Sequence, residues 1–215
     1  MMGHGVAWLR VLPSTAASLS IATMVLPCIA AEADTEPDGV YGRLDGDISL
    51  SPHLGVQLYR GQAEPALGFQ AMYVSTLGLS LSHADTRLLF GAQSTDRSLT
   101  SVEFKLCPLF LGRWSQAWEA GPPLLDLTLD SFTLGLGAFW DYDLALGILR
   151  RGTSISASLS LPLLSQMRGP WLGAMLGLRM AEGTAYPAYP AQTYLVSGVS
   201  VSYTWLVDST MHDDR

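Results

Sequence analysis

The segment from Thr153 to Pro162, TSISASLSLP, alternates apolar and polar residues without a break. Its apolar positions carry Ile, Ala and Leu, and the residues between them are serine. Side chains of a β-strand point alternately to opposite faces, so this pattern predicts a strand with one apolar and one polar face. In a soluble sandwich the apolar face is turned inward, whereas in a membrane barrel it faces lipid and the serines line the interior.

The same alternation recurs along most of the chain. In residues 66–83 the apolar side chains stay at odd-numbered positions throughout, which favours a single long strand. Two shorter strands hinged at Ser75 and Thr76 are the alternative. Pro52 cannot donate a ladder hydrogen bond and is expected to separate two strands. Eight strands at this spacing predict a sandwich or a barrel, and a count of ten stays open. The expected strands are 40–51, 54–60, 66–83, 99–111, 132–142, 153–162, 171–180 and 193–205.

One segment breaks the strand pattern. Leu111, Trp114 and Trp118 follow helical spacing, which predicts a short amphipathic helix near residues 112–120. Such a helix suits a membrane surface or one end of a soluble core equally well. We expect Pro122-Pro123 to end it.

The N-terminus has the features of an export signal. Residues 16–30 form an uncharged apolar core behind Arg10, and small residues follow at Ala30, Ala31 and Ala33. The expected organisation is a signal peptide at 1–31, an acidic leader at 32–39, a β-barrel domain at 40–206 and a C-terminal tail at 207–215.

Composition favours a membrane barrel over a soluble domain. The chain is 48% hydrophobic and only 14% charged, against a charged share of about 25% in soluble domains. After the N-terminus no apolar run reaches the roughly 18 residues of a membrane helix.

Removal of residues 1–31 would leave 11 basic and 19 acidic residues. This acidity argues against nucleic acid as a partner, because phosphate binding needs a basic surface.

Charged and aromatic residues fit the same interpretation. In a barrel with apolar faces toward lipid, the polar faces would place charged and amide side chains in the lumen, where Lys105, the only lysine, stands beside Glu103. The expected lumen residues are Arg43, Asp45, Asp47, Gln57, Gln70, Glu103, Lys105, Asp141 and Arg179. Aromatic residues near the expected strand ends suggest the girdles of membrane barrels. They are Trp140, Tyr142, Trp171, Tyr203 and Trp205.

The last strand carries a family resemblance. Val199, Val201, Tyr203 and Trp205 resemble the C-terminal recognition signal of bacterial outer-membrane barrels, although residues 206–215 follow where many family members end. Together with the export signal and the repeated strands, the chain resembles small bacterial outer-membrane β-barrel proteins. The resemblance implies an all-β, closed, antiparallel, up-and-down transmembrane barrel in the outer membrane. Its partners would be outer-membrane lipid and, during biogenesis, the barrel-assembly machinery; a small-molecule or protein ligand is not identified.

An even strand number would place both termini in the periplasm. On that count residues 84–97 and 181–192 are external loops, and the helix near 112–120 lies on the periplasmic side.

Candidate catalytic chemistry centres on His83. A hydrolase would need a serine bonded to this histidine and a carboxylate to orient the ring. In an extended strand His83 shares a face with Asp85 but not with Ser80 or Ser82, so we assign no catalytic residue. The remaining histidines of the exported chain, His53 and His212, lie in an expected turn and in the tail.

No metal or cofactor site is assigned either. Asp45 and Asp47 lack the ligand spacing of a calcium loop and fit a lumen ion pair with Arg43 better. There is no glycine-rich phosphate loop and no zinc-type Cys/His cluster. We therefore expect a role in envelope integrity, adhesion or surface interaction. A lipid-modifying outer-membrane enzyme, and a soluble exported β-sandwich or lipocalin-like binding protein, are the alternatives.

Overall fold

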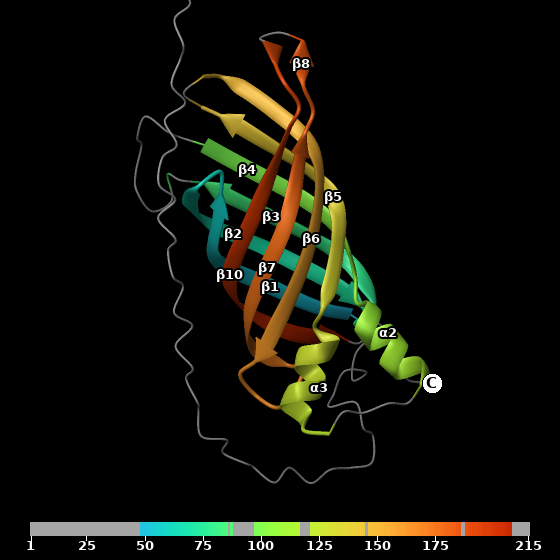
Figure 1. Cartoon of the computed structure of the whole chain (residues 1–215). Helices are drawn as coiled ribbons and strands as arrows, with labels where there is room; N and C mark the ends of the chain where they lie inside the picture. The colour runs from blue at the N-terminus through green and yellow to red at the C-terminus, as the bar shows by residue number, and fades with distance from the viewer. Residues whose placement is uncertain are drawn as a thin grey trace, which may run out of the picture. The chain divides into compact units, whose positions relative to one another are not determined.

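Eight antiparallel strands close into a barrel in the computed structural model (Figure 1). The structure describes residues 48–85, 87, 97–116, 121–144, 146–185 and 188–207. The barrel strands are β1 (Ile48–Tyr59), β2 (Gln62–Tyr73), β3 (Leu77–Asp85), β4 (Arg97–Leu106), β5 (Thr133–Asp143), β6 (Ile148–Pro162), β7 (Gly169–Ala181) and β10 (Gln192–Val207). Each pairs with its neighbour along the chain, and β10 closes the barrel against β1. The predicted up-and-down barrel and its strand count are confirmed.

The two ends of the barrel differ. One end, called the helix end below, carries the start of β1, the β2–β3 turn, the helices α2 (Pro108–Ser115) and α3 (Pro123–Asp130), the β6–β7 connection and the end of β10. The other end, called the hairpin end, carries the remaining four connections. In the last of these, β8 (Thr184–Ala185) and β9 (Ala188–Tyr189) form a small sheet, within a segment predicted to be a loop. The helices lie at the end opposite to the predicted external loops.

The prediction that Pro52 separates two strands is wrong. Pro52 lies inside β1 and is paired in register with Phe69 of β2. On the β10 side the ladder is interrupted at Ser51 and Pro52 without any change of register. There the Ser51 and Thr204 hydroxyls are hydrogen-bonded at 2.8 Å. The missing proline N–H therefore interrupts one ladder locally and leaves the strand intact.

The prediction of one long strand at 66–83 is also wrong, and the hinged alternative is correct. Residues 74–76 form a tight turn, in which Thr76 donates through both its backbone N–H and its hydroxyl to the Tyr73 carbonyl, each at 2.9 Å. Val74 and Ser75 have φ angles of 45° and 51°, in the left-handed region. The turn pairs Tyr73 with Leu77, both odd-numbered, so the alternation runs through it unbroken. This error and the one at Pro52 offset each other in the strand count.

The described residues between β4 and β5 include two helices, where one was predicted. Helix α2 begins four residues before 112 and ends at Ser115, and Trp118 lies outside the described residues. Pro122-Pro123 does not end a helix but starts α3, with proline in the first turn. The first N–H groups of a helix have no intrahelical acceptor, so proline is tolerated there. Among the described residues, no helix combines the length and hydropathy needed to cross a membrane.

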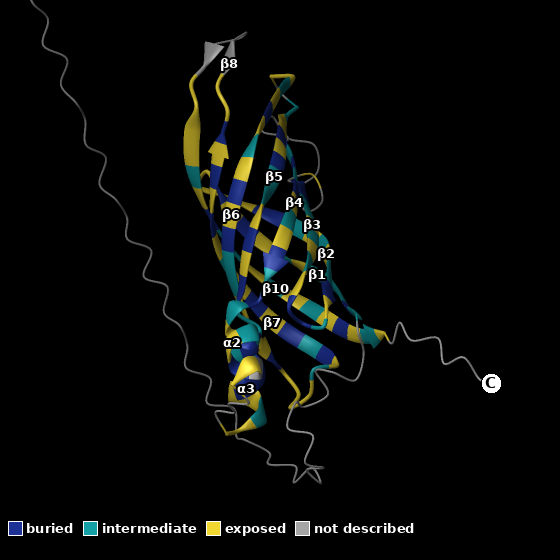
Figure 2. Ribbon diagram, turned by 90° about the vertical axis from the view of Figure 1, so that its right-hand side faces the viewer, coloured by how far each residue is buried: buried dark blue, intermediate teal, exposed yellow. Residues whose placement is uncertain are grey.

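The barrel has its apolar face outside. In β6 the side chains of Ile155 and Leu159 are 46% and 43% exposed, whereas Ser154 and Ser156 are buried. The same alternation of exposed and buried residues runs along the other strands (Figure 2). The serines of TSISASLSLP therefore face the barrel interior, as predicted for a membrane barrel.

Candidate functional site: the barrel lumen

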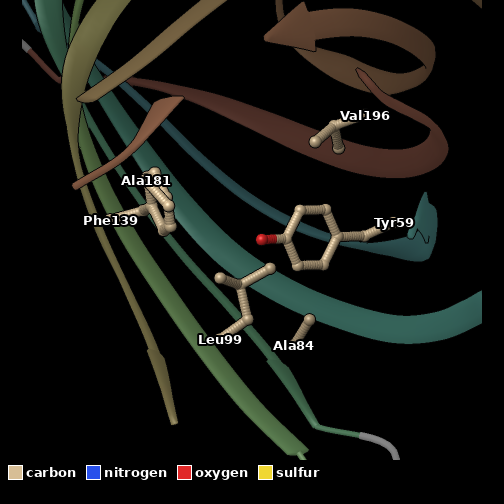
Figure 3. Packing of buried hydrophobic residues seen from close by; sticks show 6 residues of the cluster. All are labelled: Tyr59, Ala84, Leu99, Phe139, Ala181 and Val196. Atoms are coloured by element: carbon tan, nitrogen blue, oxygen red, sulfur yellow. The ribbon is translucent and has the colours of Figure 1, made fainter. Parts of the chain in front are cut away.

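An apolar cluster from six strands fills the lumen at the hairpin end (Figure 3). Its members are Tyr59, Ala84, Leu99, Phe139, Ala181 and Val196. Tyr59 and Phe139 are 0% exposed, and the ring of Tyr194 packs edge-on against Tyr59 at 5.3 Å between centroids. An eight-stranded barrel is just wide enough for side chains to fill. These residues therefore close this part of the lumen.

A buried charged network, the Arg97 network, contacts this cluster at Tyr59. Arg97 donates from Nε and Nη2 to the two carboxylate oxygens of Asp141, at 2.7 and 2.6 Å. The Tyr59 hydroxyl also donates to Asp141, at 3.3 Å. Glu64 lies 3.7 Å from Arg97 Nη1 and accepts from Gln57 at 3.3 Å. Bidentate geometry and burial make the Arg97–Asp141 pair a strong, directional contact between β4 and β5.

A second network lies further toward the helix end. Lys105 Nζ contacts Glu103 at 2.7 Å and donates to the Ser156 hydroxyl at 2.8 Å. The Ser156 hydroxyl in turn donates to Glu103 at 2.6 Å. Gly135 leaves room for this group, since a Cβ there would lie 2.7 Å from both the lysine and the carboxylate. The expected lumen pairing of Lys105 with Glu103 is present in the structure.

A cavity of about 180 Å³, lined by both polar and apolar residues, occupies the lumen between these networks and the helix end. Hydroxyl groups from six of the eight barrel strands line it. They belong to Ser49, Ser51, Ser80, Ser82, Ser101, Thr133, Ser158, Ser160, Ser200, Ser202 and Thr204. Gln70 and His53 line it too. Gln57, Gln70, Asp141 and Arg179 of the expected lumen residues therefore also face inward, whereas Arg43, Asp45 and Asp47 lie outside the described residues.

Helix α3 covers the cavity at the helix end. Leu127, which is 1% exposed, lines the cavity together with Asp130 and Ser131. Arg113 of α2 donates to the Asp126 carboxylate and, at 2.9 Å, to Asp130. The two helices are thus clamped together by a buried guanidinium. Ser131 joins them to the barrel, because its hydroxyl donates to the Ser160 carbonyl at 2.6 Å.

Arg179 stands apart from the other lumen cations. It is 3% exposed and lines the cavity. Its guanidinium lies 5.2 Å from the centroid of the Tyr59 ring and 5.8 Å from that of Phe139. Within the described residues its Nη1 has no hydrogen-bond partner, and no carboxylate lies within 4 Å of the guanidinium.

The residues around His83 do not form a serine hydrolase triad. His83 Nδ1 contacts the Thr100 hydroxyl at 3.0 Å. Ser82 is hydrogen-bonded to Ser101 at 2.7 Å inside the lumen, and Asp85 is engaged by Arg87 at 2.6 Å. The structure therefore brings a threonine, and not the serines near it in sequence, to the histidine.

The other candidate residues are placed as follows. His53 lies within β1, not in a turn, and its ring packs over Gly68, where a Cβ would collide with it. His212 and Asp45–Asp47 lie outside the described residues. No group of three or more His, Cys, Asp or Glu side chains that could hold a metal occurs in the described part of the chain.

Four of the five predicted girdle aromatics face outward. Trp140 and Tyr142 lie near the hairpin end and Tyr203 and Trp205 near the helix end, each about 40% exposed. Trp171 is a wrong prediction. It is 4% exposed and donates from its indole N–H to the Met167 carbonyl at 3.0 Å, because its odd position in β7 faces the lumen.

Two features of the lumen were missed in the sequence. Helix α3 was missed because PLLDLTLD is short and its prolines were interpreted as a helix stop. The proline at the first helical position was the available signal. The Arg97–Asp141 pair was missed because Arg97 was placed in a loop.

Comparisons with known proteins give structural likeness only. Neither the scan against protein-family models nor the search of curated proteins gives a match. The chain is similar to the N-terminal β-barrel domain of Pseudomonas aeruginosa OprF, with a TM-score of 0.46, 12% identity and coverage of 74% of this chain and 98% of that one. It is also similar to Ail, the attachment invasion locus protein of Yersinia pestis, with a TM-score of 0.34, 11% identity and coverage of 74% and 96%. Location and activity are therefore argued from the residues of this chain alone.

Proposed function

We propose that this chain is an integral β-barrel of the bacterial outer membrane with a structural or surface-interaction role. The observation that carries the proposal is the inversion of the barrel, with an apolar outer face around a polar, charged interior. Leucines such as Leu54, Leu79 and Leu136, which are 66%, 59% and 59% exposed, lie in different strands of the outer face. Contiguous apolar surface on a soluble monomer rarely exceeds a few hundred Å². Lipid is the solvent that fits this face.

Backbone hydrogen bonding fits a membrane as well. Every barrel strand pairs on both sides, and β1 pairs with β10, so the sheet has no open edge. In lipid an unpaired backbone group costs several kcal/mol, which is why only helices and closed barrels span membranes. The strands have 9 to 16 residues, compared with the roughly 9 to 11 needed for a tilted spanning strand.

The aromatic residues indicate where the two membrane interfaces lie. Tyr203 and Trp205 pack together at 4.9 Å between ring centroids near the helix end. On β5 Trp140 and Tyr142 face outward near the hairpin end. Tyrosine and tryptophan favour the interfaces because one part of each ring is apolar and another can hydrogen-bond.

The even strand number supports an orientation with the helix end in the periplasm. Exposed Leu124 and Leu125 of α3 are then at the inner interface, beside β6, with which α3 is in contact. The hairpin end, including β8 and β9, would project outside the cell. Surface interactions would then involve the connections of that end.

A structural role fits the lumen better than open diffusion. The apolar cluster and the Arg97 network fill the hairpin end, and α3 covers the other. During biogenesis the outward residues Val199, Val201, Tyr203 and Trp205 of β10 would be recognised by the barrel-assembly machinery.

Cell fractionation tests the location. The full chain, expressed with residues 1–31 in a Gram-negative host, should sediment with the outer membrane. The protein should also migrate differently on a gel before and after boiling. Recovery as a monomer in the detergent-free periplasmic fraction would rule out the proposal.

Epitope insertion tests the orientation. A tag inserted after Gly183, in the β7–β10 hairpin, should be labelled by antibody on intact cells. A matched tag after Gln166, in the β6–β7 connection, should be labelled only after the cells are opened. The reverse pattern would invert the orientation.

A further inference from the structure

The cavity contains a buried cation without a hydrogen-bond partner among the described residues. Arg179 is 3% exposed, and its contacts are with the rings of Tyr59 and Phe139. A buried guanidinium normally has its N–H donors satisfied, because an unsatisfied buried polar group costs about 1–3 kcal/mol or more. An acceptor group in the cavity would supply what the protein does not.

The other charges at the cavity are already paired. Glu103 is held by Lys105 at 2.7 Å, and Asp130 at the opposite end is held by Arg113 at 2.9 Å. These are the carboxylates that line the cavity. Arg179 is therefore the cavity cation whose hydrogen-bonding capacity remains unused within the described residues.

Serine and threonine hydroxyls are the most numerous polar groups in the rest of the lining. Ser160 and Ser200 lie on either side of Gly173, where a Cβ would be 3.3 and 2.8 Å from their oxygens. Glycine at this position keeps the space in front of these serines open. A hydroxyl both donates and accepts, so a wall of serines suits a ligand that carries hydroxyl groups itself.

We propose that this cavity binds a small hydroxylated carboxylate. Arg179 holds the carboxylate, since the planar guanidinium matches its two oxygens in a bidentate geometry. Serine hydroxyls of the cavity wall exchange hydrogen bonds with the ligand hydroxyls. Small eight-stranded barrels can hold one small ligand in this way, and the volume of about 180 Å³ fits a ligand of a few carbon atoms. The proposal goes beyond the structural role and does not depend on the membrane in which the barrel resides.

Three matched small molecules test the two halves of the site. Glycerate carries a carboxylate and two hydroxyls, propionate lacks the hydroxyls, and glycerol lacks the charge. The chain without residues 1–31, refolded in detergent, is titrated with each one, and the heat of binding is measured by calorimetry. We expect saturable binding of glycerate, and at least tenfold weaker binding of propionate and of glycerol.

Variants then identify the anchor. Arg179→Gln should weaken glycerate binding at least tenfold and leave glycerol binding unchanged. Arg151→Gln, on an outward side chain that is 73% exposed, should bind glycerate as the wild type does. Because Arg179→Gln could fail to fold, heat-modifiable gel migration is the folding control.

Three results would overturn the proposal. They are the absence of saturable glycerate binding by the folded wild-type chain, equal affinities for glycerate and propionate, and unchanged glycerate binding by folded Arg179→Gln. Failure of the outer-membrane proposal appears separately, in the fractionation experiment.

Discussion

The guanidinium of Arg97 and the carboxylate of Asp141 form a bidentate ion pair across β4 and β5, with N–O distances of 2.7 and 2.6 Å. The two side chains are only 7% and 1% exposed. Arg97 also lies over the Tyr59 ring, with its central carbon 4.5 Å from the ring centroid. This ion pair therefore joins β4 to β5. Through Tyr59 it also contacts β1 and the apolar cluster at the hairpin end.

Removing the charge of Asp141 should strongly destabilise the barrel. Asp141→Asn leaves the Arg97 charge without its main partner in the lumen, and breaking a buried pair typically costs about 3–5 kcal/mol. We expect a loss of that order in the free energy of unfolding, measured by urea titration of the protein in lipid vesicles. The matched control is Glu182→Gln, which breaks the ion pair between Glu182 and Arg151. Their side chains are 62% and 73% exposed, respectively, so this substitution should lower the free energy of unfolding by less than about 1 kcal/mol.

A charge on the outer face should distinguish lipid from water. Leu136 is 59% exposed near the middle of the β4–β5–β6 wall. If it faces lipid, Leu136→Arg should cost about 2–4 kcal/mol in vesicles, whereas an exposed substitution in water usually changes stability by less than about 0.5 kcal/mol. Leu146→Arg is the control, because Leu146, 61% exposed, lies in the β5–β6 connection. Equally small losses of stability in the two variants would contradict the prediction that the outer face of the barrel contacts lipid.

The β2–β3 turn should tolerate glycine better than its native valine. Val74 has φ 45°, a conformation that costs a side-chain-bearing residue roughly 1–2 kcal/mol. Val74→Gly should therefore raise the free energy of unfolding by about 1 kcal/mol, measured by urea titration. Val199→Gly, in the extended strand β10, should lower it instead. A destabilised Val74→Gly protein would show that the valine side chain has a packing role that outweighs the strain.

Helix α3 should contact lipid headgroups. Leu124 and Leu125 are 39% and 48% exposed. A tryptophan introduced as Leu125→Trp should add fluorescence that brominated lipids quench, measured as the difference from the parent protein in vesicles. Glu182→Trp, at the hairpin end beyond β7, should add fluorescence that these lipids quench far less. Equal quenching at the two positions would contradict the interfacial placement of α3.

Alternation identified the faces of the strands better than it identified their ends. The outward positions of β4 and β6 were predicted correctly, because side-chain parity is a local property of an extended chain. Trp171 was misassigned because its aromatic character was given more weight than its parity with Gly173. At Pro52 and at residues 74–76 the parity continues through the boundary, so the pattern could not show which of the two is a turn.

The candidate site was only partly predictable. Parity places Glu103, Lys105 and Arg179 on the polar faces of their strands, and these faces point inward once the chain is interpreted as a membrane barrel. Glu103 and Lys105 are also close in sequence. The partners of Arg97, and the contacts of Arg179 with the Tyr59 and Phe139 rings, depend on which residues meet across the lumen. That depends on strand tilt and register around the closed barrel, which no short segment determines.

The sequence by itself therefore determined that this chain forms strands with serine-rich polar faces, because a period of two is a local property of the chain. The low charge content, the aromatic strand ends and the last strand favoured an interior position for those faces. Only the tertiary structure decided that Arg97 meets Asp141, that α3 covers the serine-lined cavity, and that Arg179 lines this cavity without a hydrogen-bonding partner among the described residues. These contacts join residues far apart along the chain, and closure of the barrel brings them together.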